Sequence, residues 1–325
     1  METNIINQND LIIQDVDVDV RATKPFIEAN TKPVKLKHLK DDCIIPVFSK
    51  DNEMTISHYQ FIEAVNNMVH NYFPDEQILA PDIRVSHVIK GRVPSAIGKP
   101  VKELLEEEKT IYYERCAFII QVPSIQLEVN NNHLGLTIGG VRAYNQENLY
   151  SKKSLERFKV FIGFRNKVCT NLCVSTDGIL NDVRVGSVTD LSEHFGNLLH
   201  DYNQEQHLST IEEFGDISIT EEQFAHLIGK LRMAQYLGSN EEIITPMLFN
   251  DSQINNVVKN YYVNPDFGVE DNKSISLWKL YNLFTGSNKS SYVDSFLSRS
   301  VFAFEFVKEL AISLDQGKPN WYLNN

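Results

Sequence analysis

Alternation of apolar and polar side chains predicts a β-strand over residues 158–168. One parity is wholly apolar and consists of Phe158, Val160, Ile162, Phe164 and Val168. The other parity combines three cations with an aromatic ring and a glycine: Lys159, Phe161, Gly163, Arg165 and Lys167. Successive side chains of a strand point to opposite faces, so the apolar set should be buried. The second set should meet water, an acidic neighbour or an anionic ligand, because burying an unpaired charge is costly.

Turn chemistry predicts a hairpin at Asp177 and Gly178. These two residues separate strand-like runs at 168–176 and 179–185. Asp-Gly supplies the positive φ angles that a two-residue hairpin turn requires at both central positions. We therefore expect the two runs to pair with each other.

A second hairpin is predicted around the asparagines at 130–132. The preceding segment alternates from Ile125 and the following segment alternates from Leu134. A further strand-like run covers residues 110–122, and Pro123 should close it because proline cannot donate to a sheet. Successive strands joined by short turns favour an antiparallel sheet.

From residue 186 the pattern changes to that of amphipathic helices, with apolar residues three or four positions apart. The predicted helices cover residues 191–202, 221–237, 253–262, 277–284 and 292–314. An earlier helix should begin after Ser57, because Ser57 and Gln60 have the spacing of a capping box.

The predicted fold class is α+β, with a central antiparallel sheet and a mostly helical C-terminal layer. Residues 1–22 are polar, with aspartate at alternate positions near their end, and are expected to form a flexible N-terminal tail. Residues 23–185 should form a mixed domain built on the sheet. Residues 186–325 should form a helical part that packs on it, since no low-complexity linker separates the two.

Composition places the chain among ordinary globular proteins and predicts no membrane partner. The 325 residues suffice for one large or two modest domains. The first residues lack the basic and apolar regions of a signal peptide, and no apolar run is long enough to span a bilayer. A cytoplasmic location is therefore the expectation, and the four cysteines are expected to be reduced thiols.

Charge is distributed unevenly along the chain, whose net charge is −12. Residues 130–185 carry eight Lys and Arg against four Asp and Glu, or +4, whereas residues 186–325 carry nine against 19, or −10. A basic segment within an acidic protein suits a local anion-binding surface. It equally suits an acidic helical layer that docks on a basic sheet face, and the sequence leaves both open.

Two basic segments supply the candidate binding residues. Residues 84–102 contain five Lys and Arg, one His and no acid, and should form a strand followed by an exposed loop. Gly139 and Gly140 precede Arg142 and Tyr144, which suits either close approach to nucleic acid or a bulge or corner in the sheet. The residues predicted to contact nucleic acid are Lys90, Arg92, Arg142, Tyr144, Lys159, Phe161, Arg165 and Lys167.

No sequence motif assigns a catalytic residue, a metal or a cofactor. Cys169 and Cys173 lack the second pair of ligands that a zinc site needs, and core burial is the simpler explanation for them. Phosphate-binding loops, H-E-x-x-H and G-x-S-x-G are absent from the sequence. We therefore expect no cofactor, and a non-enzymatic protein is favoured over an enzyme that acts on nucleotides or nucleic acid.

Seven blocks stand in order from about Thr23 to the C-terminus: TKPFIEANT, RVSHVIKGR, KTIYYERCAF, GGVRAYNQENLYS, FIGFRNKVCTNLCVSTDG, SLWKLYNLFTGSNKS and WYLN. They resemble a family from Bacteroides-type gut bacteria that is known as a domain of unknown function and is often carried on mobile elements. Residues 158–171 and 278–285 are also similar to the phage/plasmid-like protein family, which pairs F-x-x-K/R-V-C-T/S-N with a later W-x-x-Y/L-N-x-x-T. Neither family brings an established activity, so the resemblance implies a genetic setting and no mechanism.

Two classes of function follow. The first is an accessory protein of a bacterial mobile element that binds single-stranded nucleic acid, such as single-stranded DNA, through the basic sheet face and the 84–102 loop. The second is a protein-interaction module, for instance one that counters host defence, in which an acidic helical surface imitates nucleic-acid charge and binds a host or element protein. A continuous basic groove would favour the first class, and a basic face covered by helices would favour the second. The sequence does not indicate an oligomeric state.

Overall fold

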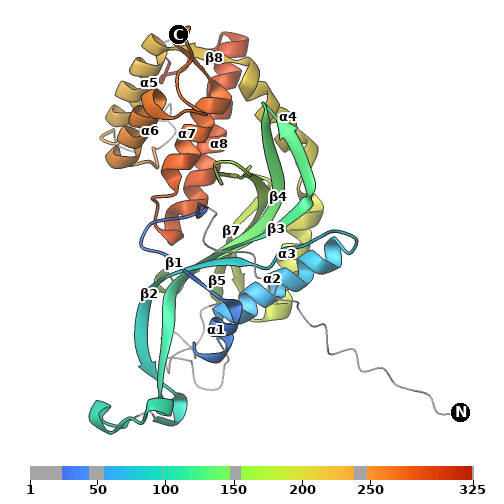
Figure 1. Ribbon diagram of the computed structural model, residues 1–325, viewed down its shortest axis with the longest axis vertical. Coiled ribbons are helices and arrows are strands. Elements are labelled where there is room, and N and C mark those ends of the chain that lie inside the picture. Colours follow the sequence, from blue (N-terminus) through green and yellow to red (C-terminus); the bar gives the residue numbers. More distant parts are fainter. Residues whose placement is uncertain (1–23, 44–54, 97, 147–154, 238–246, 324–325) are drawn as a thin grey trace, which may run out of the picture.

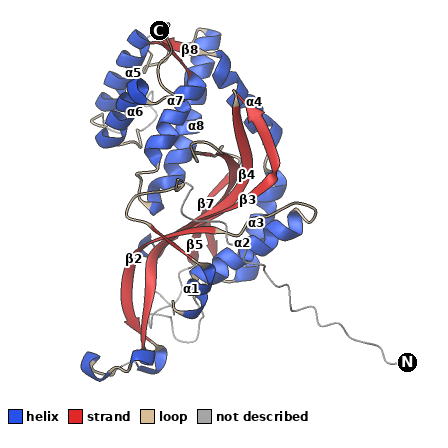
Figure 2. Ribbon diagram, viewed as in Figure 1, coloured by secondary structure: helices blue, strands red, loops and turns tan. Residues whose placement is uncertain are grey.

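A curled antiparallel sheet runs through the molecule. Helices pack against the sheet, and further helices lie beyond one end of it (Figure 1). The computed structural model describes residues 24–43, 55–96, 98–146, 155–237 and 247–323. Strands dominate the first half of the chain and helices the second (Figure 2). The fold is α+β, as the sequence predicts.

Within the described residues, the main sheet consists of β1 (Lys32–Val34), β2 (Asp82–Arg92), β3 (Lys109–Val129), β4 (Asn132–Ala143), β5 (Glu156–Asn166), β6 (Leu172–Cys173) and β7 (Ile179–Val185). The helices are α1 (Leu36–Asp41), α2 (His58–Tyr72), α3 (Val188–Asp201), α4 (Gln204–Asp216), α5 (Glu221–Ala234), α6 (Asp251–Val263), α7 (Leu277–Asn288) and α8 (Val293–Gln316). A separate two-stranded sheet pairs β8 (Ser218–Thr220) with β9 (Ser274–Ser276). Short 3₁₀ turns cover Pro94–Ala96, Val101–Glu103, Glu106–Glu108 and Tyr144–Gln146.

The hairpin predicted around the asparagines at 130–132 is confirmed. It joins β3 to β4, and Val129 pairs with Asn132 at its closed end. Asn130 and Asn131 have φ angles of 50° and 59°, the left-handed conformation that a two-residue hairpin turn requires and that asparagine tolerates.

The expectation that Pro123 ends its strand is wrong. β3 continues through the proline as far as Val129. The register against β4 shifts between Val122 and Gln126, and this irregularity accommodates a residue that cannot donate a hydrogen bond.

The hairpin predicted at Asp177 and Gly178 is also wrong. β6 and β7 both pair with β5. They are two parts of one interrupted strand that runs antiparallel to β5. Asp177 and Gly178 lie in the interruption without a positive φ, and Ile162 N donates a hydrogen bond of 2.8 Å to Gly178 O. A Cβ on Gly178 would lie 2.3 Å from Ile162 O, so glycine is needed here for close approach to β5.

The predicted helices form, with ends that differ by a few residues. α2 begins at the Ser57 capping box, where Gln60 N donates to Ser57 Oγ at 3.0 Å. α4 was not predicted, because its buried apolar residues are only Leu208, Ile211 and Phe214. None of the described helices is long and apolar enough to cross a membrane.

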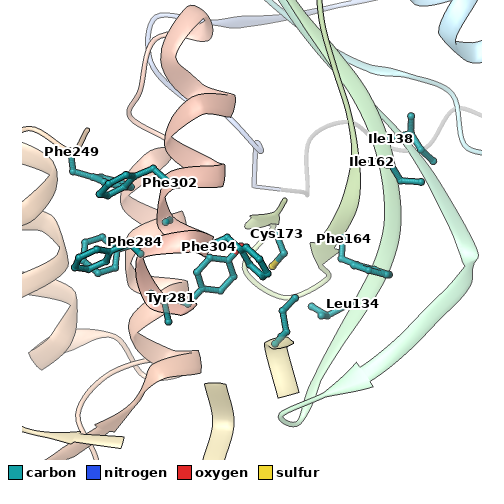
Figure 3. Close-up of a cluster of buried hydrophobic side chains, with 14 of the residues drawn as sticks. Leu134, Ile138, Ile162, Phe164, Cys173, Phe249, Tyr281, Phe284, Phe302 and Phe304 are labelled. Carbon is teal, nitrogen blue, oxygen red and sulfur yellow. The ribbon is translucent and has the colours of Figure 1, made fainter. Parts of the chain in front are cut away.

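Buried side chains form two clusters, one on each face of the sheet. The larger cluster joins β3, β4 and β5 to the helices, and in Figure 3 Phe164 and Leu134 of the strands face Tyr281 and Phe304 of α7 and α8. The smaller cluster lies on the opposite face. It comprises Phe26, Ile27, Ala117, Ile119, Val141, Phe161, Leu172, Val174, Ile179, Val293, Phe296 and Leu297.

One part of the sheet consists of two strands, with Tyr113 at its base in the larger cluster. β1 pairs only with Ile83–Val85 of β2, and β4 pairs with β3 only as far as Arg115. Residues 86–92 and 109–114 therefore form a two-stranded ribbon, here called the arm, which projects at the end of the molecule away from α5 and α6 (Figure 1).

Candidate functional site

The apolar parity of β5 is buried as predicted. Phe158, Val160, Ile162 and Phe164 are between 0% and 2% exposed and belong to the larger cluster. Val168 is an exception at 59% exposed, because β5 ends at Asn166 and Val168 lies in the turn beyond it.

The opposite parity of β5, which was predicted to bind nucleic acid, is covered by α8 and an N-terminal segment. Phe161 is 1% exposed and belongs to the cluster formed with Phe26 and Phe296. Lys159 is half-buried, and its Nζ donates 2.9 Å to Asp294 O and 3.4 Å to Ser298 Oγ of α8. Burial lowers the pKa of Lys159. In this position the Phe161 ring and the Lys159 ammonium contact α8 rather than a ligand.

Arg165 and Lys167 differ in their surroundings. Arg165 is 6% exposed, and its Nη2 donates 3.4 Å to Lys24 O. Burial lowers the pKa of Arg165, and the nearby Asp82 carboxylate opposes this effect. Lys167 is exposed and donates to Gln126 Oε1.

Arg142 and Tyr144 are buried in a structural ion-pair site. Arg142 Cζ lies 4.5 Å from the ring centroid of Tyr144 and 4.4 Å from that of Phe158. Its Nη2 donates 2.6 Å to Glu156 Oε2, and its Nη1 donates to Ile56 O. Since the Arg142 side chain has no exposed surface, this site fastens the start of α2 to β4 and β5.

Gly139 and Gly140 do not approach a ligand. A Cβ on Gly139 would lie 2.1 Å from Phe118 O, and one on Gly140 would lie 2.4 Å from the ring of Phe61. The glycines allow the neighbouring strand and α2 to approach β4 closely. Neither nucleic acid nor a corner in the sheet is needed to explain them.

The predicted nucleic-acid face is therefore corrected. Arg142, Tyr144, Phe161 and Arg165 are buried, and Lys159 is half-buried beneath α8. The alternation along β5 distinguishes its two faces, but it does not indicate what covers the second one. Of the other predicted residues, Lys90 and Lys167 are exposed and Arg92 is half-buried.

Lys90 and Arg92 lie on the arm, beside a basic segment that was not predicted to bind nucleic acid. Four exposed lysines lie along β1 and α1: Lys32, Lys35, Lys37 and Lys40. α1 lies against the arm, because His38 Nε2 and Tyr113 Oη are 3.0 Å apart and Thr110 Oγ1 donates 3.3 Å to Asp42 O. Four lysines within nine residues, without an acid among them, are a signal that could have identified this surface. We call the arm and these lysines the basic end.

A cleft of about 640 Å³ opens at the basic end, between the arm and the chain that closes its tip. It is lined by Asp42, Lys90, Gly91, Arg92, Val101, Leu104, Glu106, Lys109, Thr110 and Ile111. Two of the predicted binding residues therefore share one concave site.

A further concentration of charge lies on α3 and α4. We call it the acidic ridge, and it consists of the exposed residues Asp190, Glu193, Asp201, Glu205, Glu212, Glu213 and Asp216. Residues 185–229 contain no Lys or Arg. Within the described parts of the chain, none of the seven carboxylates forms an ion pair.

The structure defines an α+β protein with a curled antiparallel sheet, a projecting basic end and an acidic helical ridge. Among the described residues, no group of three His, Cys, Asp or Glu side chains could hold a metal ion. A sequence model described as "Domain of unknown function, B. Theta Gene description (DUF3871)" matches residues 6–323, and the chain belongs to this family. The expected resemblance to a Bacteroides family is thus confirmed. No curated protein and no solved structure matches the chain.

Proposed function

We propose that this protein is a non-enzymatic interaction module that binds a basic protein surface through the acidic ridge. The observation that carries the proposal is the run of seven exposed carboxylates on α3 and α4, in a segment without Lys or Arg. The basic face of β5 supports the same conclusion, because α8 packs against it.

The ridge suits a partner whose own binding site is built for phosphate groups. α3 and α4 follow each other directly and are each roughly 20 Å long, from the helical rise per residue. Their carboxylates present repeated negative charge along a rigid surface. Such a surface steers a basic partner toward it and disfavours acidic partners. If the chain is carried on a mobile element, as its resemblance implies, a host defence protein that binds incoming nucleic acid has the required basic surface.

The test measures binding to protamine, an arginine-rich protein, by titration calorimetry. A ridge variant replaces Glu193, Glu205, Glu212 and Glu213 with Gln. A control variant removes the same number of exposed carboxylates elsewhere, with Asp75→Asn, Glu103→Gln, Glu107→Gln and Asp315→Asn. Because each exposed charge pair contributes about 0.2–1 kcal/mol, we expect the ridge variant to bind about tenfold more weakly or worse.

The control variant has the same net charge as the ridge variant and should bind protamine nearly as well as the wild type. If both variants weaken equally, protamine responds only to total charge, and the ridge is not a specific surface.

A second candidate function is binding of single-stranded nucleic acid at the basic end. The observation in its favour is that Lys90 and Arg92 project from the arm beside the exposed lysines of β1 and α1. These cations could neutralise phosphates without any contact to the covered face of β5.

This candidate is tested with a single-stranded oligonucleotide. Lys35→Gln together with Lys37→Gln should reduce the slope of log affinity against log salt by about 0.7 for each lost phosphate contact. Lys259→Gln together with Lys318→Gln removes two exposed cations from the helical part and serves as the control. Equal slopes for the wild type and both variants would exclude the basic end as a nucleic-acid surface.

A further inference from the structure

Side chains of three different kinds line the cleft at the basic end. Its floor is one face of the arm, where Arg92 pairs with Lys109 and Lys90 pairs with Ile111 across the two strands. Side chains at directly paired positions lie on the same face of the ribbon, about 5 Å apart at Cβ. Three cations therefore share this floor with one apolar side chain.

Two of the three cations have no carboxylate partner among the described residues. Lys109 Nζ lies 2.5 Å from Glu106 Oε1, so its charge is compensated. Arg92 donates only to the backbone oxygen of Lys99, and Lys90 makes no ion pair within the described chain. Like charges at neighbouring positions of one ribbon face repel each other. An anion between Lys90 and Arg92 would relieve this repulsion.

The second wall is apolar. Val101 and Leu104, from the turns that close the tip, line the cleft together with Ile111. Val101 is 71% exposed, so much of its apolar surface is open to contact. The lining also contains acceptors, because Asp42 and Glu106 are carboxylates that pair with His38 and Lys109. The volume of about 640 Å³ lies within the range of small-molecule sites.

We propose that this cleft binds a nucleoside phosphate, with the phosphate between Lys90 and Arg92 and the base against Val101, Leu104 and Ile111. A phosphate monoester carries a charge of about −1.5 to −2 at neutral pH, which matches two unpaired cations. A flat ring suits a surface of aliphatic side chains, and amino groups on a base suit the carboxylates. The ligand is either a free nucleotide or the terminal nucleotide of a strand, since the two present the same groups.

The experiment titrates the protein with adenosine monophosphate, adenosine and inorganic phosphate. Adenosine monophosphate should bind at least about tenfold more tightly than either fragment, because only it reaches both the cations and the apolar wall. Arg92→Gln should weaken adenosine monophosphate about tenfold or more. Lys102 is an exposed cation in the turn next to Val101, and it does not line the cleft. Lys102→Gln should therefore leave the affinity for adenosine monophosphate unchanged.

The apolar wall is tested separately. Val101→Ser should weaken adenosine monophosphate but leave phosphate binding unchanged. Val101 is largely exposed, so this variant should fold as the wild type does, which its melting temperature checks. Equal binding of phosphate and adenosine monophosphate, or no effect of Arg92→Gln, would overturn the proposal.

A final comparison distinguishes the two sources of the ligand and separates this site from the proposed ridge. A single-stranded oligonucleotide with a 5′-phosphate should bind more tightly than the same strand without it if the cleft takes a strand end. If it takes free nucleotides, adenosine monophosphate should bind and the 5′-phosphate should make no difference. The ridge variant should bind adenosine monophosphate like the wild type, so either proposal can fail while the other stands.

Discussion

The role of each charged residue in this protein depends on how deeply its side chain is buried. The Arg142 guanidinium lies between the rings of Tyr144 and Phe158 and pairs with Glu156, with no exposed surface. The same Glu156 carboxylate accepts a hydrogen bond of 3.0 Å from Ile56 N. A buried pair of this kind contributes little net stability, but removal of one partner leaves a buried charge without compensation.

Arg142→Ala should therefore lower the free energy of unfolding by about 3–5 kcal/mol. Denaturant unfolding measures this loss. The matched control is Arg157→Ala, which breaks the exposed pair of Arg157 and Asp182 and should cost less than about 1 kcal/mol. Equal costs for the two variants would contradict a structural role of Arg142.

Two buried histidines predict a loss of stability in mild acid. Burial lowers the pKa of His58 to about 3 and that of His207 to about 4. Both are neutral in the folded protein, whereas in the unfolded chain they take up protons below about pH 6.5. Their contribution to stability is complete above that pH. It decreases as the pH falls toward the pKa values that the two histidines have in the folded protein.

Between pH 7.5 and pH 5, each histidine should remove about 2 kcal/mol from the free energy of unfolding. Urea unfolding at the two pH values measures the change. His207→Gln should reduce the pH dependence by about half, since Tyr202 Oη then meets a group that does not titrate. An unchanged dependence in this variant would show that His207 takes up its proton in the folded protein as readily as in the unfolded chain.

At the scale of elements, local patterns predicted which segments form strands and helices but not which of them meet. The alternation of β5 identified Phe158, Val160, Ile162 and Phe164 as one buried face. It could not indicate that α8, from residues more than a hundred positions later, covers the other face. The pattern predicted the position of these cations on the strand correctly. It did not predict that protein, rather than a ligand, surrounds them.

Glycine illustrates the same limit. Asp177 and Gly178 have the sequence of a hairpin turn, but the contact that requires Gly178 is with Ile162 O on β5. Two asparagines at 130 and 131, a weaker signal, adopt the positive φ angles instead. Turn chemistry therefore predicts a local conformation only where tertiary contacts do not compete with it.

Gly178→Ala should lower the free energy of unfolding by about 1–3 kcal/mol, because a Cβ has no room beside Ile162 O. Gly229→Ala is the control, since a Cβ there meets nothing within 4 Å on the exposed side of α5. That variant should be stabilised by about 0.5–1 kcal/mol, the difference between glycine and alanine within a helix. Thermal unfolding of both variants checks the opposite signs.

The whole molecule separates its charges into regions with different roles. The cations of the predicted face, from Arg142 to Arg165, lie inside the structure and hold elements together. The lysines of the basic end and the carboxylates of the acidic ridge are exposed. The sequence predicted the acidic balance of the helical part and the basic segment that carries Lys90 and Arg92. It could not indicate that β1, α1 and the arm form one surface, since these segments are distant along the chain.

The basic face of β5 is a docking face for α8, which leaves binding to the charged surfaces outside it. The most direct test is Phe161→Ala, measured for unfolding free energy and, where the variant is folded, for affinity to a single-stranded oligonucleotide. Because Phe161 is 1% exposed, the variant should lose about 3–5 kcal/mol of stability and keep the wild-type affinity. Unchanged stability with binding weaker by about 1–3 kcal/mol would show that the ring stacks on bases, and would contradict the account.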